Sequence, residues 1–222
     1  MFEDKTIKKE TLIEAIDSDF EKHNEILPIL RFEAPKMGND DDRADQKAVE
    51  LLSAFSDSLK DKRNCRGGKF RAGTGSAMYY LWHADEIGAS ADGRRNGEPF
   101  GTNFSASLFA KIKGPFSVIK SFTKPDFSKA INGGPLTLEF ASSMFEGEDS
   151  INKVATLVKA YVDMGGHQLQ LNAVNTELMK DAQEHPEKHR QLVVRIWGWS
   201  AYFVELDKEY QDHVMRRQQY QV

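Results

Sequence analysis

The residues best suited to unusual chemistry lie near the end of the chain, where positions 195–203 read RIWGWSAYF. A single glycine, Gly198, interrupts this run of large apolar and aromatic side chains. Glycine weakens a buried strand because it packs nothing and loses more backbone entropy on folding than any other residue. Its presence here indicates either that the backbone approaches another group closely or that the glycine α-carbon is itself used.

The α-carbon of Gly198 could carry an unpaired electron. A glycine that loses a hydrogen atom shares the remaining electron with the carbonyl on one side and the nitrogen on the other. The radical needs a planar α-carbon, which glycine reaches without a β-carbon clashing with its neighbours. It also needs shielding from water and oxygen, which Trp197, Trp199, Tyr202 and Phe203 would supply. The alternative is a glycine at a tight turn between a strand and a helix, and on chemistry alone the turn is favoured.

Other arrangements of reactive residues are weaker. The six histidines form no HExxH motif, and Pro186 interrupts the helix that would align His185 with His189. The glycine-rich segment 64–76 matches no phosphate-loop pattern, so a structural loop is expected there. Cys65 is the only cysteine and cannot form an internal disulfide. The sequence therefore predicts no metal ligands and no cofactor-binding residues in this chain.

Composition narrows the range of partners. The 222 residues carry a formal net charge of −4, and basic residues alternate with acidic ones, so nucleic acid is not expected as a partner. No apolar run approaches the roughly 18 residues that a membrane-spanning helix needs, and the first residues lack a hydrophobic signal core. We expect a cytoplasmic protein without a membrane partner.

Hydrophobic patterning predicts several amphipathic helices. One is expected to begin with a capping box at Thr11 and Glu14, and one to follow the acidic residues 40–42, which would cap it. A third is expected from Glu148 until Gly165 and Gly166 end it. The second helix would turn one apolar face inward, made of Ala48, Leu51, Leu52, Phe55 and Leu59.

Strands are expected between these helices. The candidate segments are 76–88, 136–145, 167–174 and 191–196. Segment 89–105 is rich in turn residues and long enough to suggest a functional loop. A short helix would end before Pro186, and a last helix would turn Leu206, Tyr210 and Val214 inward. Alternating strands and helices predict an α/β architecture.

The stretch VRIWGWSAYFVELDKEYQDHVMRR, residues 194–217, closely resembles the C-terminal signature of glycyl radical enzymes, the group that includes pyruvate formate-lyase. The matching positions are Arg195, the radical glycine Gly198, Trp199, Ser200, Ala201, Tyr202, Gln211 and Asp212. Four upstream segments resemble family motifs in the family's order: APKMGNDD, RGGKFRAGTGS, DGRRNGEP and GGHQLQLNAV. A chance match over this length is very improbable.

The resemblance implies a fold and a mode of action. The chain would be the C-terminal part of a ten-stranded α/β barrel, with Gly198 on a loop that enters the barrel core near the C-terminus. Residues 1–95 would be a partial barrel segment of a larger lyase domain, and residues 96–222 the glycine radical domain. A separate activating enzyme that uses S-adenosylmethionine and a [4Fe–4S] cluster would install the radical. The full-length enzyme would be a homodimer acting on a small organic acid.

One departure from the family pattern limits what this chain would do alone. The family's thiyl cysteine lies on a separate loop, whereas Cys65 precedes Arg66, Gly67 and Gly68 in a different motif and is not given that role. Family members are also several times longer. We expect a C-terminal fragment, a truncated product or one part of a split enzyme, inactive without the N-terminal part or a homologous subunit.

The residues beside Gly198 favour one subgroup. Tryptophans on both sides of the glycine are typical of arylacetate decarboxylases of the 4-hydroxyphenylacetate type, and this is the expected activity. A formate C-acetyltransferase-like enzyme and a diol dehydratase are the alternatives within the family. A further alternative is a stand-alone glycyl radical module that complements a larger chain, and another is a homologue in which Gly198 is only a turn residue.

Overall fold

The computed structural model describes residues 6–77, 79–196, 198–217 and 219–220. A three-stranded parallel sheet has the order β2-β1-β5, and a two-stranded antiparallel sheet pairs β3 with β4. The strands are β1 (Pro135–Ala141), β2 (Gln168–Val174), β3 (Val193–Arg195), β4 (Ser200–Tyr202) and β5 (Gln219–Tyr220). The α-helices are α1 (Lys9–Asp17), α2 (Asp42–Leu59), α3 (Tyr79–Glu86), α4 (Pro115–Phe122), α5 (Glu148–Asp163), α6 (Thr176–Glu184) and α7 (Lys208–Arg216). The chain thus combines helices with a parallel sheet.

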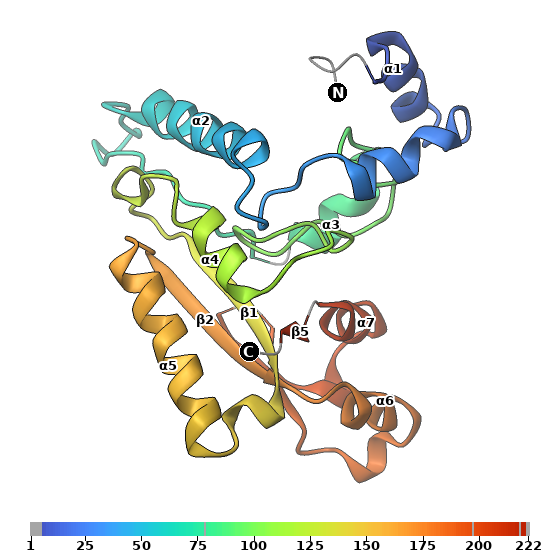
Figure 1. Cartoon of the computed structure of the whole chain (residues 1–222), viewed down its shortest axis with the longest axis vertical. Coiled ribbons are helices and arrows are strands. Elements are labelled where there is room, and N and C mark those ends of the chain that lie inside the picture. Colours follow the sequence, from blue (N-terminus) through green and yellow to red (C-terminus); the bar gives the residue numbers. More distant parts are fainter. Residues whose placement is uncertain (1–5, 78, 197, 218, 221–222) are drawn as a thin grey trace.

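The parallel sheet is built around one β1-α5-β2 unit, and α5 runs alongside the two strands (Figure 1). Alternate residues of β1 bury one face, where Leu136, Leu138 and Phe140 pack with α4 and α5. Because side chains alternate across a strand, residues 137 and 139 point to the opposite face. The sheet therefore has an apolar face toward α4 and α5 and a second face that carries polar side chains.

Two glycines end α5 as the sequence predicts, and the second has a packing role. The backbone N–H of Gly166 donates to the carbonyl of Tyr161, and a β-carbon at position 166 would lie 2.3 Å from the Tyr161 ring. Tyr161 is itself buried and donates its hydroxyl to the carbonyl of Gln168 at 2.8 Å. Glycine at 166 lets the chain turn back tightly into β2.

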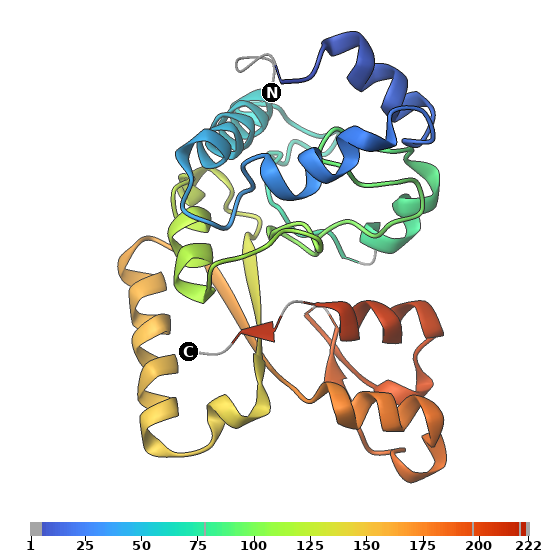
Figure 2. The same cartoon turned by 45° about the vertical axis from the view of Figure 1, so that its right-hand side comes forward.

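A second packing unit contains α6, α7 and the β3-β4 hairpin (Figure 2). Its core includes Met179, Ile196, Phe203 and Val214. The amide of Gln183 on α6 donates to Gln211 Oε1 at 3.1 Å and to Asp212 Oδ1 at 2.9 Å on α7. These hydrogen bonds join α6 to α7, and the hairpin packs against both helices through the shared apolar core.

The expected strand at 76–88 is wrong, because this segment contains helix α3. Tyr80, Leu81 and Ala84 are buried, and their i, i+1, i+4 spacing is that of a helix face. The aromatic residues suggested β-structure, but β-propensity is a weak guide when tertiary packing selects a helical spacing. The other expected strands and helices of the C-terminal half are present, although the strands expected at 136–145 and 191–196 are shorter, at Pro135–Ala141 and Val193–Arg195. The last helix begins at Lys208, so Leu206, expected on its inner face, precedes it.

Two expectations for the N-terminal helices are corrected. Helix α1 begins at Lys9, before Thr11, and its first residues have no side-chain cap. Helix α2 is capped by Asp41 as expected, but Leu51 and Phe55 on its expected inner face are exposed. Its buried face contains Asp45, whose carboxylate lies 2.6 Å from Lys124 Nζ and accepts a hydrogen bond from Ser121. A polar residue is therefore buried on this helix, whereas the apolar side chains of Leu51 and Phe55 are exposed.

The turn-rich segment 89–105 is ordered by a buried arginine. The Arg94 guanidinium donates to the carbonyls of Arg95 at 3.0 Å, Glu98 at 2.8 Å and Ile87 at 2.8 Å. It also lies 4.0 Å from the centre of the Phe100 ring. These carbonyls are therefore held in place without regular secondary structure.

Among the described helices, none is both long and apolar enough to span a bilayer.

Candidate functional site

Gly198 lies in the turn between β3 and β4, called here the Gly198 turn and defined by the described residues 196, 198 and 199. The N–H of Ile196 donates to the carbonyl of Trp199 at 3.0 Å and closes the turn. Gly198 has a φ of +65°, in the left-handed region that favours glycine. It is exposed, and no described atom outside its chain neighbours lies within 4 Å of the position a β-carbon would take. One of its two Cα–H bonds therefore points into open space.

The expected aromatic wall around Gly198 is not formed within the described part of this chain. Trp199 is 39% exposed and Tyr202 is 46% exposed. Phe203 is fully buried, but it belongs to the core of α6, α7 and the hairpin. Along β4, Tyr202 alternates with the partly buried Ala201 and so faces outward, whereas Trp199 lies in the turn before this strand. Trp197 lies outside the described residues.

Below the Gly198 turn lies the polar face of the parallel sheet. In the β1-β2 register Thr137 pairs with Gln170 and Glu139 pairs with Asn172. These four side chains share one face because paired positions of parallel strands project to the same side. Glu139 is 4% exposed, although charged residues are almost never fully buried without a partner.

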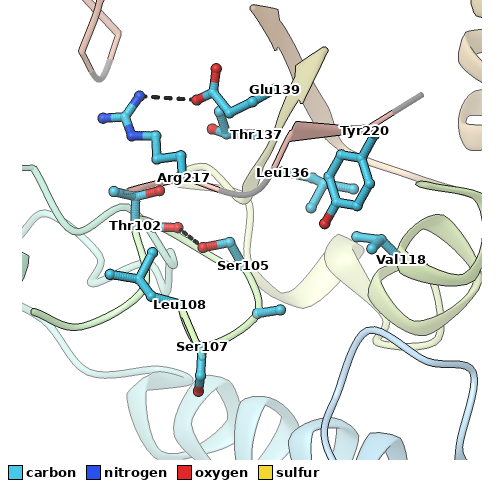
Figure 3. A pocket seen from close by; sticks show the side chains of 11 residues that line it. Thr102, Ser105, Ser107, Leu108, Val118, Leu136, Thr137, Glu139, Arg217 and Tyr220 are labelled. Carbon is cyan, nitrogen blue, oxygen red and sulfur yellow. Dashed lines mark hydrogen bonds and ion pairs between the residues drawn. The ribbon is translucent and has the colours of Figure 1, made fainter. Parts of the chain in front are cut away.

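The partner of Glu139 is Arg217, which follows α7 (Figure 3). Arg217 Nη1 lies 3.0 Å from Glu139 Oε1, and both side chains are about 95% buried. Burial raises the pKa of the Glu139 carboxyl above its usual value, while Arg217 and Asn172 act in the opposite direction. Arg217 also donates to the carbonyls of Arg195 at 3.2 Å and Ile196 at 2.8 Å, so it contacts the Gly198 turn directly.

A chain of hydrogen bonds also connects the turn with Glu139, and we call it the polar relay. The N–H of Gly198 donates to Gln170 Oε1 at 3.4 Å, and Gln170 Nε2 donates to Asn172 Oδ1 at 3.2 Å. Asn172 Nδ2 then donates to Glu139 Oε1 at 2.9 Å. Each link donates in the same direction, from the glycine amide to the carboxylate.

The sequence motifs predict no role for Gln170, Asn172, Glu139 or Arg217. A signal was present in the strands, because a glutamate interrupts the apolar run LTLEF and polar residues alternate in QLQLN. Such positions predict a polar face opposite the core. No local pattern, however, indicated that this face would meet the turn containing Gly198.

Two cavities border this polar face. One of about 310 Å³ lies between β2 and the hairpin, and Gln170, Asn172, Arg195 and Ser200 contribute its polar lining. A smaller one of about 50 Å³ is lined by both Glu139 and Arg217 (Figure 3). Thr102, Ser105 and Tyr220 are among its lining residues. Glu139 therefore lines both cavities.

The described residues contain no group of three or more His, Cys, Asp and Glu side chains that could hold a metal ion. Cys65 is exposed. It lies in a turn that is closed by the backbone N–H of Asn64, which donates to the carbonyl of Gly68 at 2.9 Å. These observations identify no cofactor-binding residue in the described chain.

His213 connects α7 to the other half of the chain. It is 2% exposed, and its ring centre lies 4.5 Å from that of Tyr80 on α3. Burial, together with the charges of Arg217 and Arg216, lowers the pKa of His213 to about 3. The histidine is therefore neutral in the folded protein near pH 7.

The stability of the protein should consequently fall in mild acid. The unfolded chain binds a proton at His213 near pH 6.5 and the folded one only near pH 3, so stability present above pH 6.5 is lost as the pH falls. His213→Phe should remove about 2 kcal/mol of the loss between pH 7 and pH 5. Urea unfolding at both pH values measures this difference, and parallel pH profiles for the two proteins would contradict it.

Two family models and several known proteins match this chain. A family model described as "Glycine radical" matches residues 102–204, which include Gly198, and one described as "Pyruvate formate lyase-like" matches residues 1–82. Trans-4-hydroxy-L-proline dehydratase of Clostridioides difficile is 32% identical over 98% of this chain and 27% of its own length. Indoleacetate decarboxylase of Tractidigestivibacter scatoligenes is 32% identical over 91% of this chain and 23% of its own.

A solved structure shows the same fold. The glycerol-bound B12-independent glycerol dehydratase from Clostridium butyricum superposes with a TM-score of 0.95 at 30% identity, over 100% of this chain and 28% of its own. The chain thus spans about a quarter of the length of these relatives. The expected α/β fold, taken from part of the barrel of such enzymes, is confirmed. The arylacetate decarboxylase link rests on one of several relatives. The chain belongs to the glycyl radical enzyme family and corresponds to the C-terminal portion of its members.

Proposed function

We propose that this chain is the radical-bearing part of a glycyl radical lyase and that Gly198 stores the radical. The observation that carries the proposal is the unobstructed Cα–H bond of Gly198, on a projecting turn inside the region that matches the glycine radical family model. The conformation is compatible with glycine alone at low cost, since its φ is +65°. The chain thus presents one glycine hydrogen to an outside reagent.

The chemistry would be two hydrogen-atom transfers. In activation, an organic radical would take one hydrogen atom from the α-carbon, becoming a closed-shell molecule and leaving the unpaired electron on Gly198. In turnover, Gly198 would take a hydrogen atom from a cysteine thiol, which becomes the thiyl radical that attacks substrate. Each transfer moves one proton and one electron together, so no net charge is created.

Two reagents would come from outside this chain. The organic radical would be made by an activating enzyme from S-adenosylmethionine with a [4Fe–4S] cluster. The thiyl cysteine would belong to the remaining part of the lyase or to a homologous subunit, because Cys65 lies exposed in a tight turn of a different motif. Alone, the chain would therefore not turn over substrate. The division into a barrel segment, 1–95, and a radical domain, 96–222, and the homodimer remain predictions.

We expect a small organic acid as the substrate, or a diol if the alternative assignment as a diol dehydratase holds. An arylacetate decarboxylase is supported by the tryptophans beside Gly198 and by the 32% identity to indoleacetate decarboxylase. A dehydratase is supported equally by the hydroxyproline relative at 32% identity and by the glycerol dehydratase fold match. Assays of the assembled enzyme with an arylacetate and with a diol would separate the two, because decarboxylation releases carbon dioxide and dehydration releases an aldehyde.

Electron paramagnetic resonance of the assembled enzyme tests the radical assignment. Here the assembled enzyme means this chain together with the part that supplies the reactive cysteine. After anaerobic activation we expect a doublet signal from one residual α-hydrogen, and after exposure to air we expect cleavage at Gly198 with release of a peptide near residues 199–222. No doublet in the presence of a competent activating enzyme, or cleavage elsewhere, would contradict the proposal.

A further inference from the structure

We propose that four polar residues outside the turn position Gly198 for the loss and return of its hydrogen: Gln170, Asn172, Glu139 and Arg217. They are positioning residues, and the inference rests on the radical role proposed for Gly198. They come from β1, β2 and the end of α7, which belong to two separately packed units of the chain. The turn is therefore fixed by the sheet beneath it as well as by the hairpin that carries it.

Arg217 fixes the approach to the turn. Its two terminal nitrogens reach the carbonyls of Arg195 and Ile196, while one of them also binds Glu139. A guanidinium can hold several acceptors at once because its donors are fixed in one plane. Glu139 lies on β1, so the strand that leads into Gly198 is tied to the centre of the parallel sheet.

The polar relay fixes Gly198 itself. The glycine has no side chain, so its N–H is the group by which the sheet can hold it, and that N–H donates to Gln170. The following links, to Asn172 and then to Glu139, run in one direction and end on a carboxylate. Hydrogen bonds in such a chain polarise one another. The relay therefore increases the electron density on the glycine nitrogen, which shares the unpaired electron.

The geometry explains why burial of a charge is tolerated here. Buried ion pairs are weak devices for stability, because desolvation offsets their attraction. A buried ion pair can instead specify a unique arrangement. Here Glu139 accepts the last hydrogen bond of the polar relay, and Arg217 donates to the carbonyls of the two residues Arg195 and Ile196. Glu139 Oε1 accepts from both Asn172 and Arg217, so one atom connects the two supports of the turn.

Gln170→Met tests the relay, with Gln168→Met as the matched control. Gln168 lies two residues earlier on the same strand and face, and its side chain accepts from Gly134 instead of Gly198. In the assembled enzyme, Gln170→Met should speed amide hydrogen exchange in the Gly198 turn about tenfold and lower the radical yield about tenfold, with an unchanged melting temperature. Displacement of a reacting group typically costs between about 10- and 100-fold in rate.

Arg217→Lys tests the second support without removing the positive charge. A lysine can bind Glu139 but cannot hold the two carbonyls in a fixed fork. We expect the same increase in exchange at residues 196–199 as for Gln170→Met, whereas the exposed neighbour Arg216→Lys should leave it unchanged. Unchanged exchange and unchanged radical yield in both Gln170→Met and Arg217→Lys would overturn the inference.

The two proposals fail in different ways. If the unmodified assembled enzyme forms no doublet, the radical role of Gly198 is wrong, and hydrogen exchange still measures whether the four residues hold the turn. If it forms the doublet and the variants match their controls in exchange and yield, only the positioning role is wrong. An equal fall in exchange protection throughout α6 and α7 would indicate general destabilisation and would also contradict positioning.

Discussion

Gly198→Ala is expected to reduce turnover of the assembled enzyme to the uncatalysed background while the protein keeps its fold. The stability cost should be small, since no described atom outside the chain neighbours meets the new β-carbon. An alanine at φ +65° costs roughly 1–2 kcal/mol. The chemical cost is total, because a β-carbon hinders the planar α-carbon on which the radical depends. Urea unfolding and substrate assays measure the two effects separately.

Gly165→Ala is the matched control for this experiment. Gly165 also has a positive φ, +83°, and open space where a β-carbon would lie, but it is placed at the end of α5. The two variants should lose similar free energies of unfolding, and only Gly198→Ala should lose activity. Substantial turnover by Gly198→Ala would refute the storage role, and equal activity losses in the two variants would attribute the effect to backbone strain.

Arg217→Met is expected to lower the free energy of unfolding by about 3–5 kcal/mol, because it leaves a buried carboxylate without its cation. The loss should depend on pH. Burial already raises the pKa of Glu139, and removing Arg217 removes an interaction that lowers it. When the pKa of Glu139 is higher in the folded protein than in the unfolded chain, where it is near 4.5, the folded protein loses stability as the pH rises above that value. The deficit should be smaller at pH 5 than at pH 8.

The double variant Glu139→Gln, Arg217→Met is the control for charge. It removes both charges and keeps an acceptor for Asn172, so it should recover most of the lost stability. Urea unfolding of the four proteins at both pH values completes a double-mutant cycle. Equal deficits at pH 5 and pH 8, or additive effects of the two substitutions, would show that Glu139 and Arg217 do not act as a pair.

Local patterns predicted the elements that pack independently of distant parts of the chain. The apolar alternation of β1 and β2, and the glycines that end α5, were sufficient for the β1-α5-β2 unit. The same reasoning failed at α3 and on the inner face of α2. At α3 the prediction followed the aromatic composition, but the buried residues have a helical spacing. In α2 a salt bridge with Lys124 holds the polar residue Asp45 on the buried face. Both outcomes depend on tertiary contacts, which a local sequence pattern does not predict.

The sequence by itself singled out Gly198 as the proposed radical site, because the resemblance of RIWGWSAYF to a family signature is a local property of the chain. It also determined the strands that support this position. Only the tertiary structure decided how Gly198 is held: Glu139 and Arg217 are 78 residues apart, and they meet because the parallel register places one polar face of β1 and β2 beneath the hairpin. The tertiary structure also decided that Tyr202 faces outward, since it alternates with the partly buried Ala201 along β4, and that Trp199 is exposed in the turn before this strand.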